Sequence, residues 1–161
     1  MDKKAERFTD TFYYDLELTT KFLRLFSVEF FKKLNTKLSQ DEFITIETIL
    51  CNSGICQRDL AKIILKDRAN TGKILNTLEE KGYITRFVDL KNNRLVRKMG
   101  VTEKGKEVYD EVTEKLKTAI NKIMADENHK KHIISDEEIE YVREILKKFR
   151  ENLKQLVDIQ I

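Results

Sequence analysis

Apolar residues near the start of the chain recur at the spacing of one face of an α-helix. Between residues 8 and 34 they fall close to a period of 3.6, with one polar turn at Thr19 and Thr20. The face is made of Phe8, Phe12, Leu16, Leu23, Phe26, Phe30 and Leu34. A helix of this length measures about 40 Å, which is too long for a small module to cover its apolar side. The pattern therefore predicts a long helix that needs a partner surface.

Helix-capping residues divide the next stretch into three shorter helices. Ser39 and Glu42 have the spacing of a capping box, so a helix is expected to begin there. Cys56 stands at the start of the next apolar repeat, and Asp67 is a good N-cap for a third helix. Gly82 follows the last repeat, as expected for the residue after a helix end.

A change of period after the third short helix predicts a β-hairpin. Residues 83–89 are rich in β-branched and aromatic side chains, and residues 95–101 alternate as a half-buried strand does. Between them, Lys91 to Arg94 supply the polar residues that a hairpin tip requires. Thr102 and Ser135 then begin two more long amphipathic helices. The predicted fold class is mostly α with a small β-hairpin wing, the arrangement of a winged helix-turn-helix.

The amino-acid composition is typical of a helical protein and also indicates its cellular location. The 161 residues include no Pro and only 5 Gly, so few positions force a break in a helix. No run of 18 apolar residues is present, so we expect a soluble, cytoplasmic protein without membrane contact. Two cysteines are too few for the disulfide framework of a secreted domain, which favours a reducing compartment.

Positive charge is concentrated in the segment that contains the three short helices and the hairpin. Residues 56–98 hold 11 Lys and Arg against 5 Asp and Glu, a net charge of +6, whereas the rest of the chain has a net charge of −3. Such a patch is typical of a surface that contacts phosphates, although a Lys-rich helical surface can also produce it by chance. The charge distribution favours a nucleic-acid partner.

The sequence offers no set of residues that would support catalysis. The two histidines, His129 and His132, can be weighed as metal ligands or as solvated residues between the last two helices, and we favour the second interpretation. Gly72 and Lys73 lack the upstream glycines of a phosphate-binding loop. We therefore expect no enzyme activity, no cofactor and no metal.

The helix that follows Asp67 is the best candidate for contact with DNA. A helix that enters the major groove presents polar side chains from its N-terminal half, where Arg and Lys can pair with guanine and Asn with adenine. The predicted contacts on this helix are Arg68, Asn70, Thr71, Lys73 and Asn76. Gly72 within the helix costs about 1 kcal/mol relative to Ala. It therefore marks a close approach, either to DNA or to a neighbouring helix.

Several motifs resemble the multiple antibiotic resistance regulator (MarR) family of transcription factors. They are Leu60-Ala61, Asp67, the block from Leu78 to Arg86 (Leu-Glu-Glu-Lys-Gly-Tyr-Ile-Thr-Arg), Asp89, and Val101-Thr-Glu-Lys-Gly105. The resemblance implies a homodimer in which residues 1–38 and 102–161 form the helical dimerisation region and residues 39–101 the DNA-binding winged helix-turn-helix. It also implies a recognition helix from Asp67 to Lys81 and a wing from Tyr83 to Val101.

The tip of the wing departs from the family pattern. Family members usually carry an acidic residue, any residue and then Arg at the hairpin tip, whereas this chain has Asn93-Arg94-Leu95. Either the hairpin has shifted its register or the acid-to-Arg brace is missing and Arg94 inserts alone into the minor groove. The predicted wing contacts with DNA are Arg86, Lys91, Arg94 and Arg97.

Two further sites follow from comparing the chain with the family pattern. Cys56 replaces the usual Ser or Thr cap, so it is either a plain substitute or a redox sensor with Cys51 as partner. The resemblance also implies a small aromatic effector, for which Phe12, Tyr13 and Tyr14 are the candidate contacts, although such a stripe more often belongs to a core.

Together these features predict a homodimeric regulator, a repressor released by a small ligand, that binds a DNA operator with half-sites about one helical turn apart. The competing hypothesis is a helical adaptor whose winged-helix module docks protein instead of DNA. Salt-dependent retention on duplex DNA would distinguish the two, because phosphate contacts release counterions.

Overall fold

The computed structural model describes residues 7–91, 94–125 and 134–156. A short 3₁₀ helix η1 (Phe8–Asp10) precedes α1 (Phe12–Lys33), and α2 (Gln40–Cys51), α3 (Gln57–Ile63) and α4 (Arg68–Glu80) follow. Strands β1 (Ile84–Lys91) and β2 (Arg94–Val101) form an antiparallel hairpin. Helices α5 (Glu103–Ala125) and α6 (Asp136–Leu156) complete the described chain. The winged helix-turn-helix predicted from the sequence is confirmed.

The predicted helix starts lie at the residues that can cap them. Ser39 N donates to Glu42 Oε2 over 2.8 Å, and Glu42 N donates to Ser39 Oγ over 3.3 Å, which makes a complete capping box at α2. Ser135 and Glu138 repeat this arrangement at α6. The hydrogen bonds from Ser135 hold the pKa of the Glu138 carboxyl below its usual value. These local contacts satisfy backbone N–H groups that would otherwise lack partners.

The first long helix begins later than its apolar pattern suggested. Residues 8–10 form the separate helix η1, and the backbone of Thr11 is extended at φ −101° and ψ 150°. The Thr11 hydroxyl accepts a hydrogen bond from Tyr14 N, so Thr11 is the N-cap of α1. The prediction of one continuous helix from Phe8 was wrong, because a Thr cap interrupts the period before Phe12.

One hydrophobic core joins the three short helices, the hairpin and the beginning of α5. Its fully buried side chains include Ile46, Ile49, Leu60, Leu75, Leu78 and Val112. Val108 and Val112 belong to α5, so the first turns of that helix are part of the core of the winged-helix body. The core therefore continues past residue 101, where the sequence had suggested a division.

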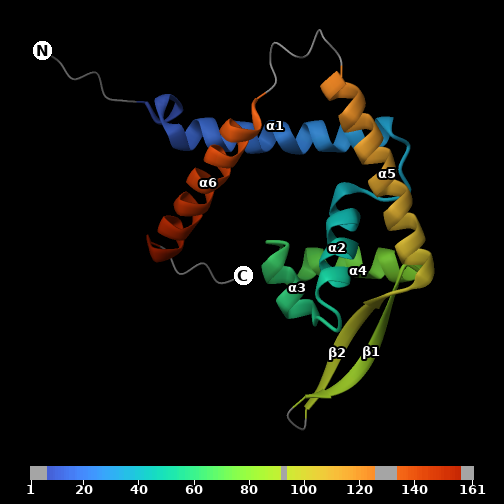
Figure 1. The fold of residues 1–161 in the computed structure, drawn as a ribbon. Coiled ribbons are helices and arrows are strands. Elements are labelled where there is room, and N and C mark those ends of the chain that lie inside the picture. Colours follow the sequence, from blue (N-terminus) through green and yellow to red (C-terminus); the bar gives the residue numbers. More distant parts are fainter. Residues whose placement is uncertain (1–6, 92–93, 126–133, 157–161) are drawn as a thin grey trace, which may run out of the picture.

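Helices α1 and α6 contrast with this body, because none of their described residues is buried. In Figure 1, α1 lies across the top of the molecule. Helix α5 extends from one end of α1 towards the hairpin, and α6 lies near the opposite end of α1 and points away from it. Large apolar side chains remain exposed on α1 and α6: Leu18, Phe22, Leu23, Leu25, Phe26, Val28, Tyr141, Val142 and Leu156. None of the helices in the described ranges has the length and apolar character needed to cross a membrane.

Candidate nucleic-acid interface

Helix α4 presents a polar face whose first half carries no acidic side chain. Arg68, Lys73 and Asn76 are exposed along it, and the acidic residues Glu79 and Glu80 come only at its end. Because the N-terminus of a helix carries a partial positive charge, this half of α4 is suited to an anionic partner. Arg68 and Lys73 lie in this half of the helix, whereas Asn76 lies in its second half.

The cap of α4 also fixes the side chain of Asn70. Asp67 Oδ1 accepts from Asn70 N over 2.8 Å, and Asp67 Oδ2 accepts from Asn70 Nδ2 over 2.6 Å. The backbone and side-chain hydrogen bonds from Asn70 lower the pKa of the Asp67 carboxyl below its usual value. Asn70 remains exposed, but one of its amide protons is already engaged by the cap.

Thr71 does not lie on the polar face, and its assignment as a DNA contact was wrong. The residue is fully buried, and its hydroxyl donates to Asp67 O over 2.8 Å. Thr71 precedes Leu75 by four residues and Leu78 by seven, so all three share the inward face of α4. The helical spacing alone could have placed Thr71 correctly.

Gly72 marks the crossing of α4 with α3. A Cβ atom at this position would lie 3.3 Å from Gln57 Nε2, which itself donates to Arg68 O over 3.0 Å. The predicted close approach to a neighbouring helix is therefore present, while the approach of Gly72 to DNA stays a prediction. The small residue lets the two helices of the helix-turn-helix share this side-chain-to-backbone hydrogen bond.

Arg86 braces the wing against α4. Its Nη2 donates to Asn76 Oδ1 over 2.7 Å, and its Nε lies 3.4 Å from Glu79 Oε2. That Nε atom is buried and the 3.4 Å contact does not have hydrogen-bond geometry, so we regard it as an ion pair only. Arg86 and Asn76 were both predicted to contact DNA, and in this conformation they contact each other.

The hairpin has a defined register up to its tip. The strands pair from Ile84 opposite Val101 to Lys91 opposite Arg94, which leaves Asn92 and Asn93 as the connection. Asn92 and Asn93 lie outside the described residues, and so do the side chains of Lys91 and Arg94. Arg97 is exposed on β2, where it pairs with Val88. The predicted contacts of Lys91 and Arg94 with DNA therefore stay predictions.

A pair that the sequence did not suggest stiffens the wing. Lys98 Nζ lies 2.5 Å from Asp89 Oδ2 on the facing strand, and the Lys98 side chain also covers Gly54. Met99 N donates to Ile55 O over 3.1 Å, which ties β2 to the loop before α3. Finding the Asp89–Lys98 pair requires the strand register, because the two residues are diagonal neighbours across the hairpin.

A hollow of about 430 Å³ opens between α3, the start of α4 and β2, and it is lined by Cys56, Gln57, Arg58, Arg68 and Val96. Arg58 adds a second guanidinium beside Arg68 and was not predicted from the sequence.

The Cys56 thiol donates to Asp59 Oδ2 over 3.1 Å, which is a contact between the cap and the third residue of α3. Cys51 is exposed at the end of α2.

The residues proposed for an effector gather in an aromatic cluster. Phe12 and Tyr13 of α1 lie 5.5 and 5.6 Å from the ring of Phe149 on α6, measured between ring centroids. Tyr14 makes an edge contact with Phe8 at 6.0 Å. This cluster connects the beginning of α1 with α6.

No group of three or more candidate metal ligands occurs within the ranges that the structure describes. His129 and His132 lie outside those ranges.

A helix-turn-helix joined to a β-hairpin wing and carried on longer helices defines the class of winged helix-turn-helix proteins. Residues 38–96 match the model of the MarR family. This segment is therefore similar to the MarR family, as the motifs had suggested, and the fold of the chain resembles that of solved regulators.

Individual proteins show the same similarity. An uncharacterized HTH-type transcriptional regulator of Bacillus subtilis, YybA, is 35% identical over 79 residues, which cover 49% of this chain and 51% of that protein. The chain thus matches about half the length of this curated relative. The transcriptional regulator SlyA has a TM-score of 0.66 at 25% identity over 89% of this chain and 94% of that one. The S. aureus MepR–DNA complex has a TM-score of 0.67 at 19% identity over 91% of this chain and 99% of that one, which is a likeness of fold.

Proposed function

We propose that this protein is a homodimeric transcriptional regulator that binds a duplex DNA operator with two copies of α4. The observation that carries the proposal is the exposed polar face of α4, with Arg68 and Lys73 in its first half and the wing beside it. A rigid helix of this kind fits the major groove, and Arg and Lys are suited to guanine edges and phosphates. The structural relative MepR, which has been solved in complex with DNA, supports this assignment.

The dimer is supported by the surface of the isolated chain. Exposed aromatic and aliphatic residues of α1 and α6 make up part of this surface. Large obligate interfaces between two subunits bury about 2,000–5,000 Å² in total. A second copy that packs on α1 and α6 would therefore account for their apolar faces.

The DNA-binding part of the proposal is tested by Lys73→Ala, with Lys117→Ala as the matched control. Lys73 is exposed on the polar face of α4, whereas Lys117 is exposed on α5 and pairs with Glu114. Fluorescence anisotropy with a labelled duplex, titrated at several salt concentrations, gives affinity and its salt dependence. The unsubstituted protein and K117A should share a steep salt slope, and K73A should bind more weakly with a slope reduced by about one.

Equal affinities and slopes for K73A and K117A would contradict the assignment of α4. Retention that does not depend on salt would contradict a phosphate-contacting surface altogether, and would favour a protein partner.

We extend the proposal to repression that is relieved by a small aromatic effector at Phe12, Tyr13 and Tyr14. A planar ligand that enters between α1 and α6 has to displace the contacts of Phe12 and Tyr13 with Phe149. A reporter under the bound promoter should be silent with the protein and active once the effector is added. Phe149→Ala should change the effector concentration at half response, and an unchanged response would remove this site.

A further inference from the structure

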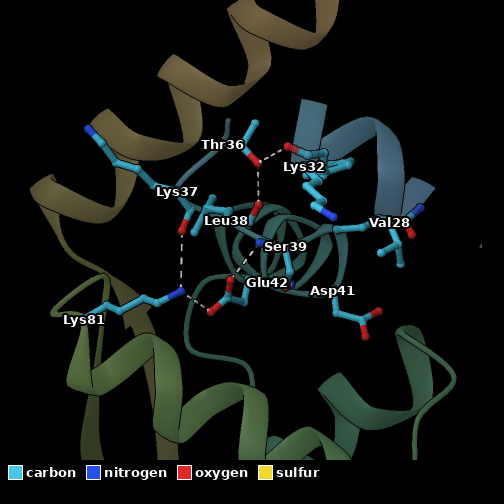
Figure 2. A pocket seen from close by; sticks show the side chains of 11 residues that line it. Val28, Lys32, Thr36, Lys37, Leu38, Ser39, Asp41, Glu42 and Lys81 are labelled. Atoms are coloured by element: carbon cyan, nitrogen blue, oxygen red, sulfur yellow. Dashed lines mark hydrogen bonds and ion pairs between the residues drawn. The ribbon is translucent and has the colours of Figure 1, made fainter. Parts of the chain in front are cut away.

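The connection between α1 and α2 is the joint at which a long helix meets the winged-helix body. Asn35 in this connection has a left-handed backbone at φ +47°, and the Thr36 hydroxyl donates to Phe31 O and Leu38 O over 3.2 and 2.7 Å. A hollow of about 390 Å³ opens beside it, with Lys81 at the end of α4 as one wall (Figure 2). The joint therefore brings the beginning of α2 and the end of α4 to one place.

Glu42 makes two different contacts at this place with its two carboxylate oxygens. Oε2 accepts from Ser39 N, which closes the cap of α2, and Oε1 lies 2.5 Å from Lys81 Nζ. Lys81 is the C-cap of α4, and its ammonium also reaches Lys37 O at 3.5 Å (Figure 2). Glu42 is only 7% exposed, whereas the Lys81 side chain remains 35% exposed, so the carboxylate is shielded from water and the ammonium is shielded only in part. One carboxylate thus joins α2, α4 and the connection from α1.

Exposed contacts tie the same connection to α5. Lys37 Nζ lies 2.7 Å from Glu111 Oε2, and Lys115 Nζ lies 3.0 Å from Glu111 Oε1 and 3.4 Å from Asn35 O. Exposed pairs of this kind contribute little on their own. The Glu42–Lys81 pair is different, because removing Lys81 would leave the buried Glu42 carboxylate without a compensating charge. We therefore expect this pair to contribute more to the geometry of the joint than the exposed pairs do.

We infer that the Glu42–Lys81 pair is a positioning device that fixes the direction of α4 relative to α1. The inference rests on the proposed function, in which α1 belongs to the dimer and α4 reads DNA. None of the residues of α1 is buried, and its ring contact with the body is that of Phe31 with Phe43 at 6.1 Å. The packing of α1 therefore does not fix the angle between α1 and the winged-helix body, so the contacts of the joint have to fix it. In a dimer, that angle sets the separation of the two copies of α4 and with it the preferred spacing of half-sites.

The first test measures the joint in the free protein. The double variant E42Q/K81M removes both charges together, so no unpaired buried charge remains, and Gln at position 42 can still complete the cap. Spin labels on cysteines introduced at the exposed positions Glu29 and Thr77, in a C51S/C56S background, report the distance from α1 to α4 within one chain when labelled chains are diluted with unlabelled ones. Double electron–electron resonance should give a wider distance distribution in E42Q/K81M.

Matched variants separate positioning from general stability. K81R keeps a cation beside Glu42 and should retain the narrow distribution. E103Q/K106M removes an exposed pair within α5 and should leave the distribution unchanged. E42Q alone, in which Gln can still accept from Ser39 N and only the partly exposed Lys81 loses its partner, is the second variant if the double variant does not fold. A distribution of unchanged width without the pair would overturn the inference.

The second test uses DNA duplexes selected with the unsubstituted protein and then altered by one inserted or deleted base pair between half-sites. The unsubstituted protein, K81R and E103Q/K106M should discriminate between the spacings. In E42Q/K81M the ratio of the affinities for the selected and the altered spacing should fall about tenfold, or by about 1.4 kcal/mol. Its affinity for random duplex should stay the same. Equal discrimination in all variants would contradict a role in spacing. Absence of DNA binding by the unsubstituted protein would overturn the proposed function, and the distance measurement would still decide whether the pair fixes the joint.

Discussion

The winged-helix body and the helices α1 and α6 follow opposite rules of construction. The body buries Ile46, Leu75 and Leu78 completely, whereas Phe22 on α1 is 68% exposed and no residue described in α1 or α6 is buried. Burial of apolar area is the main source of folding free energy, so the body can be stable within one chain. Apart from the ring contacts of Phe12 and Tyr13 with Phe149 and of Phe31 with Phe43, the apolar faces of α1 and α6 remain exposed and can gain that free energy from another surface. Stability and assembly are thus separated along the sequence.

The largest effect should come from closing the space at Gly105, where α5 meets the turn before β1. A Cβ atom there would lie 2.0 Å from Tyr83 O and 2.8 Å from Val101 Cγ1. Because backbone cannot move aside cheaply, Gly105→Ala should lower the free energy of unfolding by about 3 kcal/mol or more. Gly100→Ala is the control, since its nearest contacts are ordinary at 3.6 and 3.8 Å. Denaturant unfolding in which both variants match the unsubstituted protein would contradict this close packing.

A pair of truncations directly tests the contrast between the winged-helix body and helices α1 and α6. Leu75→Ala opens a cavity in the core and should cost about 2–5 kcal/mol of unfolding free energy. Phe22→Ala removes an exposed side chain, so it should weaken association between copies with little effect on the winged-helix body. Sedimentation equilibrium and circular dichroism measure the two effects separately. Equal association of F22A and the unsubstituted protein would remove this part of α1 from the dimer interface.

The cap of α4 gives a smaller, pH-dependent effect. Hydrogen bonds from Asn70 lower the pKa of Asp67 in the folded state, so the charged cap stabilises the protein above the unfolded pKa of about 4. That contribution is lost as the pH falls through the lower folded pKa. Asp67→Asn should therefore be less stable than the unsubstituted protein at pH 7, and the difference should shrink towards pH 3. A difference that does not depend on pH would contradict the charged cap.

The smallest effect is expected at Cys56. Ser is a preferred N-cap residue, and its hydroxyl can replace the thiol beside Asp59, so Cys56→Ser should change the unfolding free energy by less than about 0.5 kcal/mol. If Cys56 is a redox sensor, mild peroxide should weaken DNA binding by the unsubstituted protein but not by C56S. Unchanged alkylation of Cys56 and unchanged affinity after peroxide would remove the redox hypothesis.

The parts of this molecule that could be predicted are those fixed by neighbouring residues. The caps at Ser39, Asp67 and Ser135 depend on groups three residues away, and all three were found at their predicted positions. Thr71 was misassigned although its spacing to Leu75 and Leu78 pointed inward. That error came from weighing its polar side chain above its place on the helix.

Contacts between distant elements could not be predicted in the same way. Glu42 and Lys81 are 39 residues apart, and their pairing depends on how α2 crosses α4. Arg86 was predicted to contact DNA, but strand β1 brings it against Asn76 and Glu79 of α4. A single sequence indicates that these side chains are polar. It does not indicate which of these side chains contact each other in the protein alone.

We propose that function belongs to two chains, whose helices α1 and α6 place two copies of α4 on one DNA molecule. The most direct test is the mass of the complex with a selected operator duplex, measured by sedimentation velocity or by light scattering. We predict two chains per duplex, and a single half-site should bind far more weakly than the whole operator. One chain bound per operator with full affinity, or no complex at all, would contradict it.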